Sequence, residues 1–310
     1  LAVASVAWQI RGRLRDSLVQ LQAAERSEQI LSRQLAAGSE AARLLSDRLR
    51  VGEASATEVE VIRVAADRSA LQLQDARKQT EQARLAVAAA LGVPEAALDG
   101  VRMSFAALDT FPSPDQAAPS REQALLDRTD VLAALADYEA SDSALRLEIA
   151  KQYPDLDIGP GFSHGYTAGE LENSLTIGVS LTLPLLNHNQ GPIAEATARR
   201  REAAAQFNAV QERAVTQVGA ALSGYRASLA KLDTANGLLA EQRRRMASAQ
   251  ALFDAGETDH LTLAQTQGEL ATDELARLQA FTEAQLALGA LENAMQRVPG
   301  ASATQSPQHP

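Results

Sequence analysis

Apolar residues recur at steps of three and four positions, or sums of these, over the first fifty residues. The members of this stripe are Val3, Val6, Ile10, Leu14, Leu18, Leu21, Leu31, Leu35, Ala42, Leu45 and Leu49. Such spacing places the side chains on one face of an α-helix of about 50 residues, which would be about 75 Å long. A helix of this length is typical of packed helical rods.

The same period predicts four more helices, at about 57–91, 120–153, about 193–254 and about 260–296. Residues 1–93 and 193–298 contain no proline. Because proline inside a helix costs about 3 kcal/mol, such stretches are compatible with long uninterrupted helices. Residues 93–119 hold four of the 11 prolines and predict an irregular connection, while the polar tail 298–310 is expected to be disordered.

A different period governs the middle of the chain. From Ser174 to Leu183 apolar and polar residues alternate strictly. The apolar face of this predicted strand is formed by Leu175, Ile177, Val179, Leu181 and Leu183. An earlier run with apolar residues two or four apart predicts a partner strand, and the polar segment 167–173 predicts the turn of a β-hairpin. Long strands with one aliphatic and one small polar face suit a membrane barrel, although a soluble hairpin packed on helices explains the same period.

The chain repeats itself with an offset of 204 residues. Val51–Ser55 falls on Ala255–Asp259, and Leu14 falls on Val218. The repeating unit is a long helix, a Gly-Glu turn and a shorter helix, with Gly52 and Gly256 where the helix must end and reverse. The second unit follows a short helix and a hairpin, and the first unit follows neither. We therefore expect the chain to lack its natural N-terminal portion.

Composition narrows the possible functions. With 39 acidic and 29 basic residues the formal net charge is −10, which argues against a nucleic-acid binder because such proteins need a basic surface. The absence of cysteine excludes disulfides, thiolate metal sites and cysteine nucleophiles. No run of about 18 uncharged apolar residues is present, so the sequence predicts no transmembrane helix.

Catalytic motifs are weak. Ser228 and Lys231 match the pattern S-x-x-K, but they lie in the middle of a predicted helix without companion motifs. The four histidines, at 164, 188, 260 and 309, lack metal-ligand spacing. The sequence therefore predicts a protein that is not an enzyme and has no cofactor and no metal site.

Several segments together resemble the TolC-like outer-membrane efflux channels, over nearly the whole chain. Residues 183–196 resemble the junction between strand and helix in that family, and their Asn187-His188-Asn189-Gln190-Gly191 form resembles the branch that serves RND pumps of the cobalt–zinc–cadmium type. Arg128-Thr129-Asp130 stands where the family often has Arg-Pro-Asp, and Arg50–Ser55 resembles its periplasmic tip turn.

This resemblance implies a mainly α fold with a β-hairpin, in which long antiparallel helical hairpins form an α-barrel tunnel. It implies a homotrimer with a twelve-stranded barrel in outer-membrane lipid and an extension into the periplasm. The partners would be a periplasmic membrane-fusion adaptor and an inner-membrane RND pump, and the function a passive export duct with heavy-metal cations as candidate cargo. The alternative is a soluble coiled-coil scaffold or a periplasmic adaptor protein with a small β-domain.

The chain then divides into six parts. These are a first helical hairpin at 1–92, an irregular connection at 93–119, a short helix at 120–153, a membrane β-hairpin at 154–192, a second helical hairpin at 193–297 and a disordered tail at 298–310.

Three sets of site residues follow from the resemblance. The residues expected to dock the adaptor are Val51, Gly52, Glu53, Ala54, Ser55, Ala255, Gly256, Glu257, Thr258 and Asp259. The apolar face of the strand from Leu175 to Leu183 is expected to contact lipid. In the family, acidic residues six and nine positions after the tip glycine can line a gate; Glu58 fits this pattern, whereas Thr262 and Gln265 depart from it. Glu58 in the first turn of a helix equally suits a simple role at the helix N-terminus.

Overall fold

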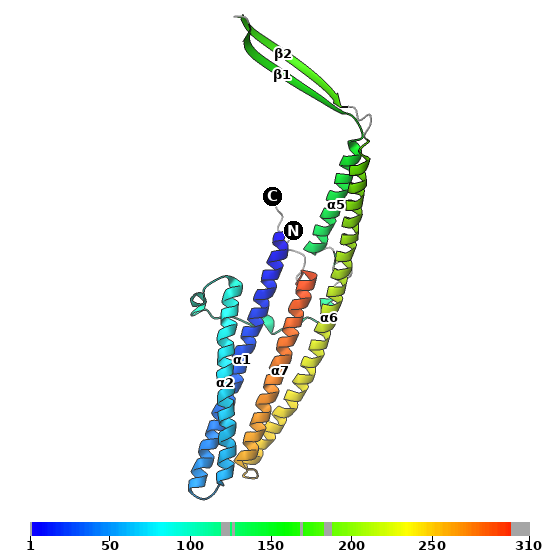
Figure 1. Cartoon of the computed structure of the whole chain (residues 1–310). Helices are drawn as coiled ribbons and strands as arrows, with labels where there is room; N and C mark the ends of the chain where they lie inside the picture. The colour runs from blue at the N-terminus through cyan, green and yellow to red at the C-terminus, as the bar shows by residue number, and fades with distance from the viewer. Residues whose placement is uncertain (1, 119–124, 126–127, 168–169, 183–187, 299–310) are drawn as a thin grey trace. The chain divides into compact units, whose positions relative to one another are not determined.

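The computed structural model describes the chain except residues 1, 119–124, 126–127, 168–169, 183–187 and 299–310 (Figure 1). Its helices are α1 (Ala2–Arg50), α2 (Ala56–Leu91), the 3-10 turns η1 (Glu95–Leu98) and η2 (Ala106–Leu108), α3 (Pro114–Ala117), α5 (Thr129–Ala150), α6 (Gln190–Asp254) and α7 (His260–Met295), and its strands are β1 (Asp155–Thr167) and β2 (Glu170–Thr182). The mainly α fold with one β-hairpin is confirmed. Beyond Val298, the tail expected to be disordered lies outside the described residues.

The chain forms two compact units. One comprises residues 128–214, and the other comprises residues 2–127 together with 215–310. Each unit contains one part of the long helix α6. None of the helices in the described part of the chain is both long enough and apolar enough to cross a membrane.

In the larger unit, α1 and α2 form an antiparallel pair (Figure 1). The buried side of α2 repeats every three or four residues, which is the spacing of one helix face. This side consists of Val59, Ile62, Ala66, Ser69, Leu73, Ala76, Ala83, Val87 and Ala88. It meets α1 in three clusters, around Leu21, Leu31 and Leu45. The expected first helical hairpin is therefore held by apolar contacts along its whole length.

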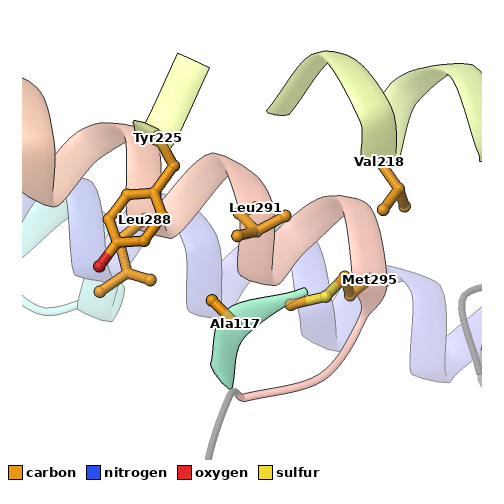
Figure 2. Packing of buried hydrophobic residues seen from close by; sticks show 6 residues of the cluster. All are labelled: Ala117, Val218, Tyr225, Leu288, Leu291 and Met295. Atoms are coloured by element: carbon orange, nitrogen blue, oxygen red, sulfur yellow. The ribbon is translucent and has the colours of Figure 1, made fainter. Parts of the chain in front are cut away.

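The second helical hairpin packs by the same means. Tyr225 of α6 is fully buried against Leu288 and Leu291 of α7, and Ala117 of α3 closes this cluster (Figure 2). The Tyr225 hydroxyl donates a hydrogen bond of 2.7 Å to the Pro112 carbonyl, so the irregular connection is fixed to the helices. Burial raises the pKa of Tyr225 to about 12.

The two helical hairpins meet where α1 contacts α7. Two glycines allow a close approach. A Cβ added at Gly289 would lie 2.7 Å from Nη1 of Arg15, and one added at Gly12 would overlap Nδ2 of Asn293. Larger residues at either glycine would therefore push the helices apart or displace these side chains.

Charged side chains are buried at the same contact. The Arg15 guanidinium donates to the Gln285 carbonyl at 2.6 Å and to its Oε1 at 2.8 Å. Glu292 forms ion pairs with Arg11 at 2.9 Å and with Arg15 at 3.5 Å. Burial lowers the pKa of Arg15, while the charge of Glu292 acts in the opposite direction. These partners compensate for the loss of water that burial of a charge entails.

The internal repeat is visible in the helix ends. α2 and α7 both have 36 residues, and their first residues, Ala56 and His260, are 204 positions apart. Each ends on a residue in the left-handed conformation, Gly92 with φ 71° and Gln296 with φ 49°. The offset found in the sequence therefore aligns both the starts and the ends of the two shorter helices.

In the smaller unit, α5 packs on the first part of α6 through polar contacts. Arg200 of α6 donates to the Tyr138 hydroxyl at 2.9 Å and forms an ion pair of 2.6 Å with Asp142. The strands β1 and β2 form a two-stranded antiparallel sheet, with Leu156 opposite Leu181 and Phe162 opposite Leu175. As expected for a single hairpin, the described residues supply no third strand for either outer edge.

Three predicted boundaries change. The helix expected at 120–153 is described as a helix from Thr129 to Ala150, and much of its first part lies outside the described residues. α6 begins at Gln190 rather than near 193, so Pro192 lies in its first turn. Proline is tolerated there because the N–H groups of the first turn have no hydrogen-bond partner within the helix. The turn expected at 167–173 is shorter, since Glu170 pairs with Thr167. Backbone pairing does not require apolar side chains.

The buried cluster of Figure 2 predicts a large effect of truncation at Leu291. Leu291 is 0% exposed, so Leu291→Ala should lower the free energy of unfolding by about 2–5 kcal/mol through lost burial and a cavity. Leu252, 46% exposed on α6, is the control, and its change to alanine should cost less than about 0.5 kcal/mol. Chemical unfolding measures both. Equal effects would contradict the packing described.

Candidate functional site

Residues 51–55, between α1 and α2, form the first tip turn. The N–H of Gly52 donates to the Leu49 carbonyl at 3.1 Å, and that of Glu53 donates to the Arg48 carbonyl at 2.9 Å. This is a Schellman motif, which satisfies carbonyls at the end of α1. Gly52 has φ +83°, a conformation that side chains with a Cβ adopt at a cost.

Residues 255–259, between α6 and α7, form the second tip turn in the same geometry. The N–H of Gly256 donates to the Phe253 carbonyl at 3.0 Å, and that of Glu257 donates to the Leu252 carbonyl at 2.9 Å. Gly256 has φ +75°. The repeat therefore preserves the backbone of the turn as well as the Gly-Glu pair.

Both tip turns end on a residue that caps the next helix. The Ser55 hydroxyl accepts from the Glu58 N–H at 3.2 Å, and the Glu58 carboxylate accepts from the Ser55 N–H at 2.7 Å, which makes a capping box. Asp259 accepts from the Thr262 N–H at 2.8 Å, and this bond lowers the pKa of the Asp259 carboxyl. Two different side chains thus perform the same task at equivalent positions.

The two tip turns lie next to each other in the larger unit (Figure 1). Leu261, just after the second turn, packs against a cluster of Leu45, Val59 and Ile62 from the first hairpin. The His260 ring contacts that of Phe253, with centroids 4.5 Å apart and planes tilted by 60°, and burial and the charge of Arg48 lower the pKa of His260. Arg48 belongs to the end of α1, so a charge beside the first tip turn acts on a side chain beside the second.

Beside the tip turns, a groove of about 180 Å³ runs between α1, α2 and α7. Its lining is mostly small or apolar and includes Gly38, Ile62, Ala66, Leu261, Ala264 and Gly268. Gln265, one of the candidate gate residues, also lines it. The structure thus brings Gln265 close to α2 but gives it no charged neighbour in this lining.

The other candidate gate residues differ in their surroundings. Thr262 is exposed, while Glu58 is half-buried with its carboxylate held by Ser55. Glu58 thus sits in the first turn of α2, as the alternative to a gate supposed, and there it completes a capping box. A role in a gate depends on neighbouring subunits and stays a prediction.

The hairpin has one apolar face, which we call the apolar hairpin face. It consists of Leu156, Ile158, Pro160 and Phe162 of β1 and Leu175, Ile177, Val179 and Leu181 of β2, which lie opposite one another in the register. The large residues among them are 52–75% exposed. Leu183, expected on the same face, lies outside the described residues.

The opposite hairpin face is small and polar. Asp157 lies opposite Ser180, Gly159 opposite Gly178, and the hydroxyls of Ser163 and Ser174 are 2.7 Å apart. The hairpin therefore separates aliphatic from small polar side chains in both strands. The sequence pattern predicted this separation for β2, and the register extends it to β1.

Asn189 is an important residue that the sequence analysis used only as part of a motif. It adopts a left-handed conformation with φ 56°, and its Nδ2 donates to the Glu148 carbonyl at 2.9 Å and to the Glu148 carboxylate at 2.7 Å. It thus ties the end of α5 to the start of α6, beside the hairpin. Asparagine tolerates this conformation better than most residues, a signal that could have identified it.

The Arg128-Thr129-Asp130 segment forms a local ion pair. Arg128 is buried and its guanidinium donates to the Asp130 carboxylate at 2.9 and 2.7 Å. These hydrogen bonds lower the pKa of Asp130. The pair lies at the N-terminus of α5, where a carboxylate also favours the helix dipole.

The residues of the S-x-x-K pattern are engaged elsewhere. The Ser228 hydroxyl donates to the Gly224 carbonyl at 2.8 Å, and Lys231 forms an ion pair of 2.6 Å with Glu283. Among the described residues, no three histidine or carboxylate side chains are grouped as metal ligands would be.

Comparison with known proteins decides the family. The sequence profile described as "Outer membrane efflux protein" matches residues 121–296, more than half of the chain. The chain belongs to the outer membrane efflux protein family. The resemblance drawn from the tip turns, the hairpin and the strand-to-helix junction is thereby confirmed.

Among relatives of this efflux family member is the cobalt-zinc-cadmium resistance protein CzcC of Cupriavidus metallidurans. The two are 24% identical over 271 residues, which cover 86% of this chain and 63% of CzcC. The chain thus spans less than two thirds of the length of that relative.

Solved structures share the fold. A membrane protein from Pseudomonas aeruginosa superposes with a TM-score of 0.75 at 20% identity, over 95% of this chain and 70% of that one. The open state of the MtrE outer membrane channel of Neisseria gonorrhoeae gives a TM-score of 0.75 at 17% identity, over 95% and 67% of the two chains. At these identities the likeness establishes the fold of the efflux family member.

The cap at Asp259 predicts a pH-dependent contribution to stability. Its folded-state pKa lies below the ordinary value of 3.8, so the stabilisation is present above that pH and is lost as the pH falls through the lowered pKa. Asp259→Ala should cost about 1 kcal/mol of unfolding free energy at neutral pH, and less in strong acid. Asp259→Asn is the control, because asparagine caps without titrating. A difference between the aspartate and alanine proteins that does not change with pH would contradict this assignment.

Proposed function

We propose that the chain forms, as a homotrimer, the outer-membrane export duct of a tripartite RND-type efflux system. In this proposal its hairpin contributes to a membrane barrel and its helices form a tunnel in the periplasm. Membership of the efflux family supports the duct over the alternatives of a soluble scaffold or a periplasmic adaptor.

The apolar hairpin face is the observation that carries this proposal. It exposes large aliphatic side chains from both strands, which is costly in water and favourable in lipid. The opposite face carries serine, glycine and aspartate, which suit a water-filled lumen. Because two strands cannot satisfy their outer edges alone, the hairpin also needs strands from elsewhere.

The cargo proposed is a heavy-metal cation. Two observations support it: the 24% identity to a cobalt-zinc-cadmium resistance protein and the net charge of −10, which would attract cations into a tunnel. Loss of the gene should then lower tolerance to cobalt, zinc or cadmium in the organism that carries it. Unchanged tolerance to all three metals would contradict the proposed cargo but not the proposed export duct.

Localisation tests the duct directly. The full-length protein, expressed in a Gram-negative host, should fractionate with the outer membrane and be extracted by detergent as a trimer. Recovery as a soluble monomer would overturn the proposal.

The apolar hairpin face predicts different tolerance to charge on its two sides. Val179→Arg should impair assembly into the membrane, by about 2–4 kcal/mol if residue 179 lies near the bilayer midplane. Ser180→Arg is the matched control, since Ser180 lies on the polar face opposite Asp157. Yields of folded trimer in the outer membrane measure both. Equal yields would argue against a lipid-facing role.

The tip turns are proposed to dock the adaptor. Gly52→Val or Gly256→Val should reduce efflux without preventing trimer assembly, because valine disfavours the positive φ of the turn. Gly52→Asn is the control, since asparagine tolerates this conformation. If the valine variants keep wild-type metal resistance and wild-type cross-linking to the adaptor, the tips do not dock it.

Glu58 is proposed to contribute one carboxylate per subunit to a gate. Three such charges around the trimer axis would attract cations. Glu58→Gln keeps a side chain that can complete the capping box, so a loss of cation selectivity in single-channel recordings would report on charge alone. Glu81→Gln, at an exposed position much further along α2, is the control. Unchanged selectivity and divalent block in Glu58→Gln would assign Glu58 to capping only.

A further inference from the structure

A cavity of about 240 Å³ lies among α1, α6 and α7 in the larger unit. Three helices contribute arginines to its lining, which are Arg26, Arg33, Arg243 and Arg277. Among the described residues, one carboxylate, that of Glu274, lines the same cavity. Such a concentration of positive charge contrasts with the formal net charge of −10 of the whole chain. We call this cavity the arginine pocket.

Two of the arginines share the single carboxylate of the lining. Glu274 forms ion pairs with Arg33 at 3.0 Å and with Arg243 at 3.5 Å. The side chains of the two arginines are 69% and 62% exposed, whereas that of Glu274 is 17% exposed. Each guanidinium has five N–H groups, and one carboxylate cannot accept from all of them. Both arginines therefore keep donors for a further acceptor.

The other two arginines lie over one aromatic ring. The guanidinium carbons of Arg26 and Arg277 are 5.3 and 5.9 Å from the centroid of Phe281. Arg26 also pairs with Asp109 at 2.7 Å. Arg277 donates to the side-chain oxygen of Asn236 at 2.8 Å and, within the described part of the chain, pairs with no carboxylate. These contacts restrict both side chains, so their donors are positioned before a ligand binds.

Apolar side chains form the floor of the arginine pocket. They are Ile30 of α1, Leu239 of α6 and Leu278 of α7, and each is buried. An organic anion can place its charge against the arginines and its apolar group on this floor, whereas an inorganic ion gains nothing from it. Pockets for drug-sized ligands have about 300–1,000 Å³, so the smaller volume here restricts the ligand to a small one.

We propose that the arginine pocket binds a small phosphomonoester, with its phosphate on the four arginines and its organic group on the apolar floor. Two carboxylates, those of Glu274 and Asp109, pair with the four guanidinium groups among the described residues, which leaves two positive charges for a dianion. Donors that come from three helices suit a tetrahedral group. The pocket lies within one chain, so the proposal does not depend on the homotrimer or its cargo.

Three probes separate the two parts of the pocket. Phenyl phosphate carries both a charge and a ring, inorganic phosphate carries only the charge, and phenol carries only the ring. In calorimetric titrations of the full-length detergent-extracted protein, phenyl phosphate should bind at least about tenfold more tightly than either of the others. Its affinity should fall as salt is added, because exposed charges are screened. Equal affinities for phenyl phosphate and inorganic phosphate would overturn the proposal.

Two variants change the charge of the arginine pocket in opposite directions. Arg243→Gln should weaken the binding of phenyl phosphate about three- to tenfold, because one charged donor is lost. Arg245→Gln removes the same charge from an exposed position two residues further along α6, and it is the matched control. Glu274→Gln should tighten binding, since the carboxylate that competes with the phosphate for Arg33 and Arg243 is lost.

The results separate a specific site from general attraction by charge. If Arg243→Gln and Arg245→Gln weaken the binding of phenyl phosphate equally, the anion responds only to net charge and the pocket is not its site. Unchanged or weaker binding in Glu274→Gln would likewise count against the proposal. None of these results bears on the export duct, because membrane localisation and trimer yield are measured without the ligand.

Discussion

The structure of the larger unit depends on the contact between α1 and α7, which joins two repeats that could otherwise separate. Gly12 and Gly289 bring the helices close, and this proximity excludes water from Arg15 and Glu292. Buried charges of this kind destabilise a fold unless each has a partner. Gln285 and Arg11 supply partners for these two charges, and such specific pairs favour one register of the two helices.

Local features of the fold could be predicted from the sequence because they depend on neighbours in the chain. The positive φ of Gly52 and Gly256, the long helices and the apolar side of β2 all follow from patterns within a few residues. The pairing of Arg15 with Gln285 does not, since these residues are 270 positions apart. In the sequence alone Arg15 and Glu292 resemble the solvated charges of any long helix.

The candidate site shows the same limit in another form. The internal repeat was enough to locate both tip turns, because a glycine at a helix end reflects the local need for a positive φ. The capping roles of Glu58 and Asp259 could be assigned only from the hydrogen bonds in the structure. In the sequence, a carboxylate near a helix N-terminus is equally compatible with a cap and with the charged lining of a tunnel. The sequence analysis missed the role of Asn189 in joining α5 to α6. Its partner, Glu148, lies 41 residues earlier in the chain, on the other side of the hairpin.

The polar character of the contact between α1 and α7 has a physical reason. Both helices belong to one chain, so the charges of Arg15 and Glu292 lose water only as their partners in the same fold arrive. Glu292 pairs with both Arg11 and Arg15, and the Arg15 guanidinium also donates to Gln285. These pairs exchange water for partners on the neighbouring helix, which is why charged side chains can stay buried at this contact.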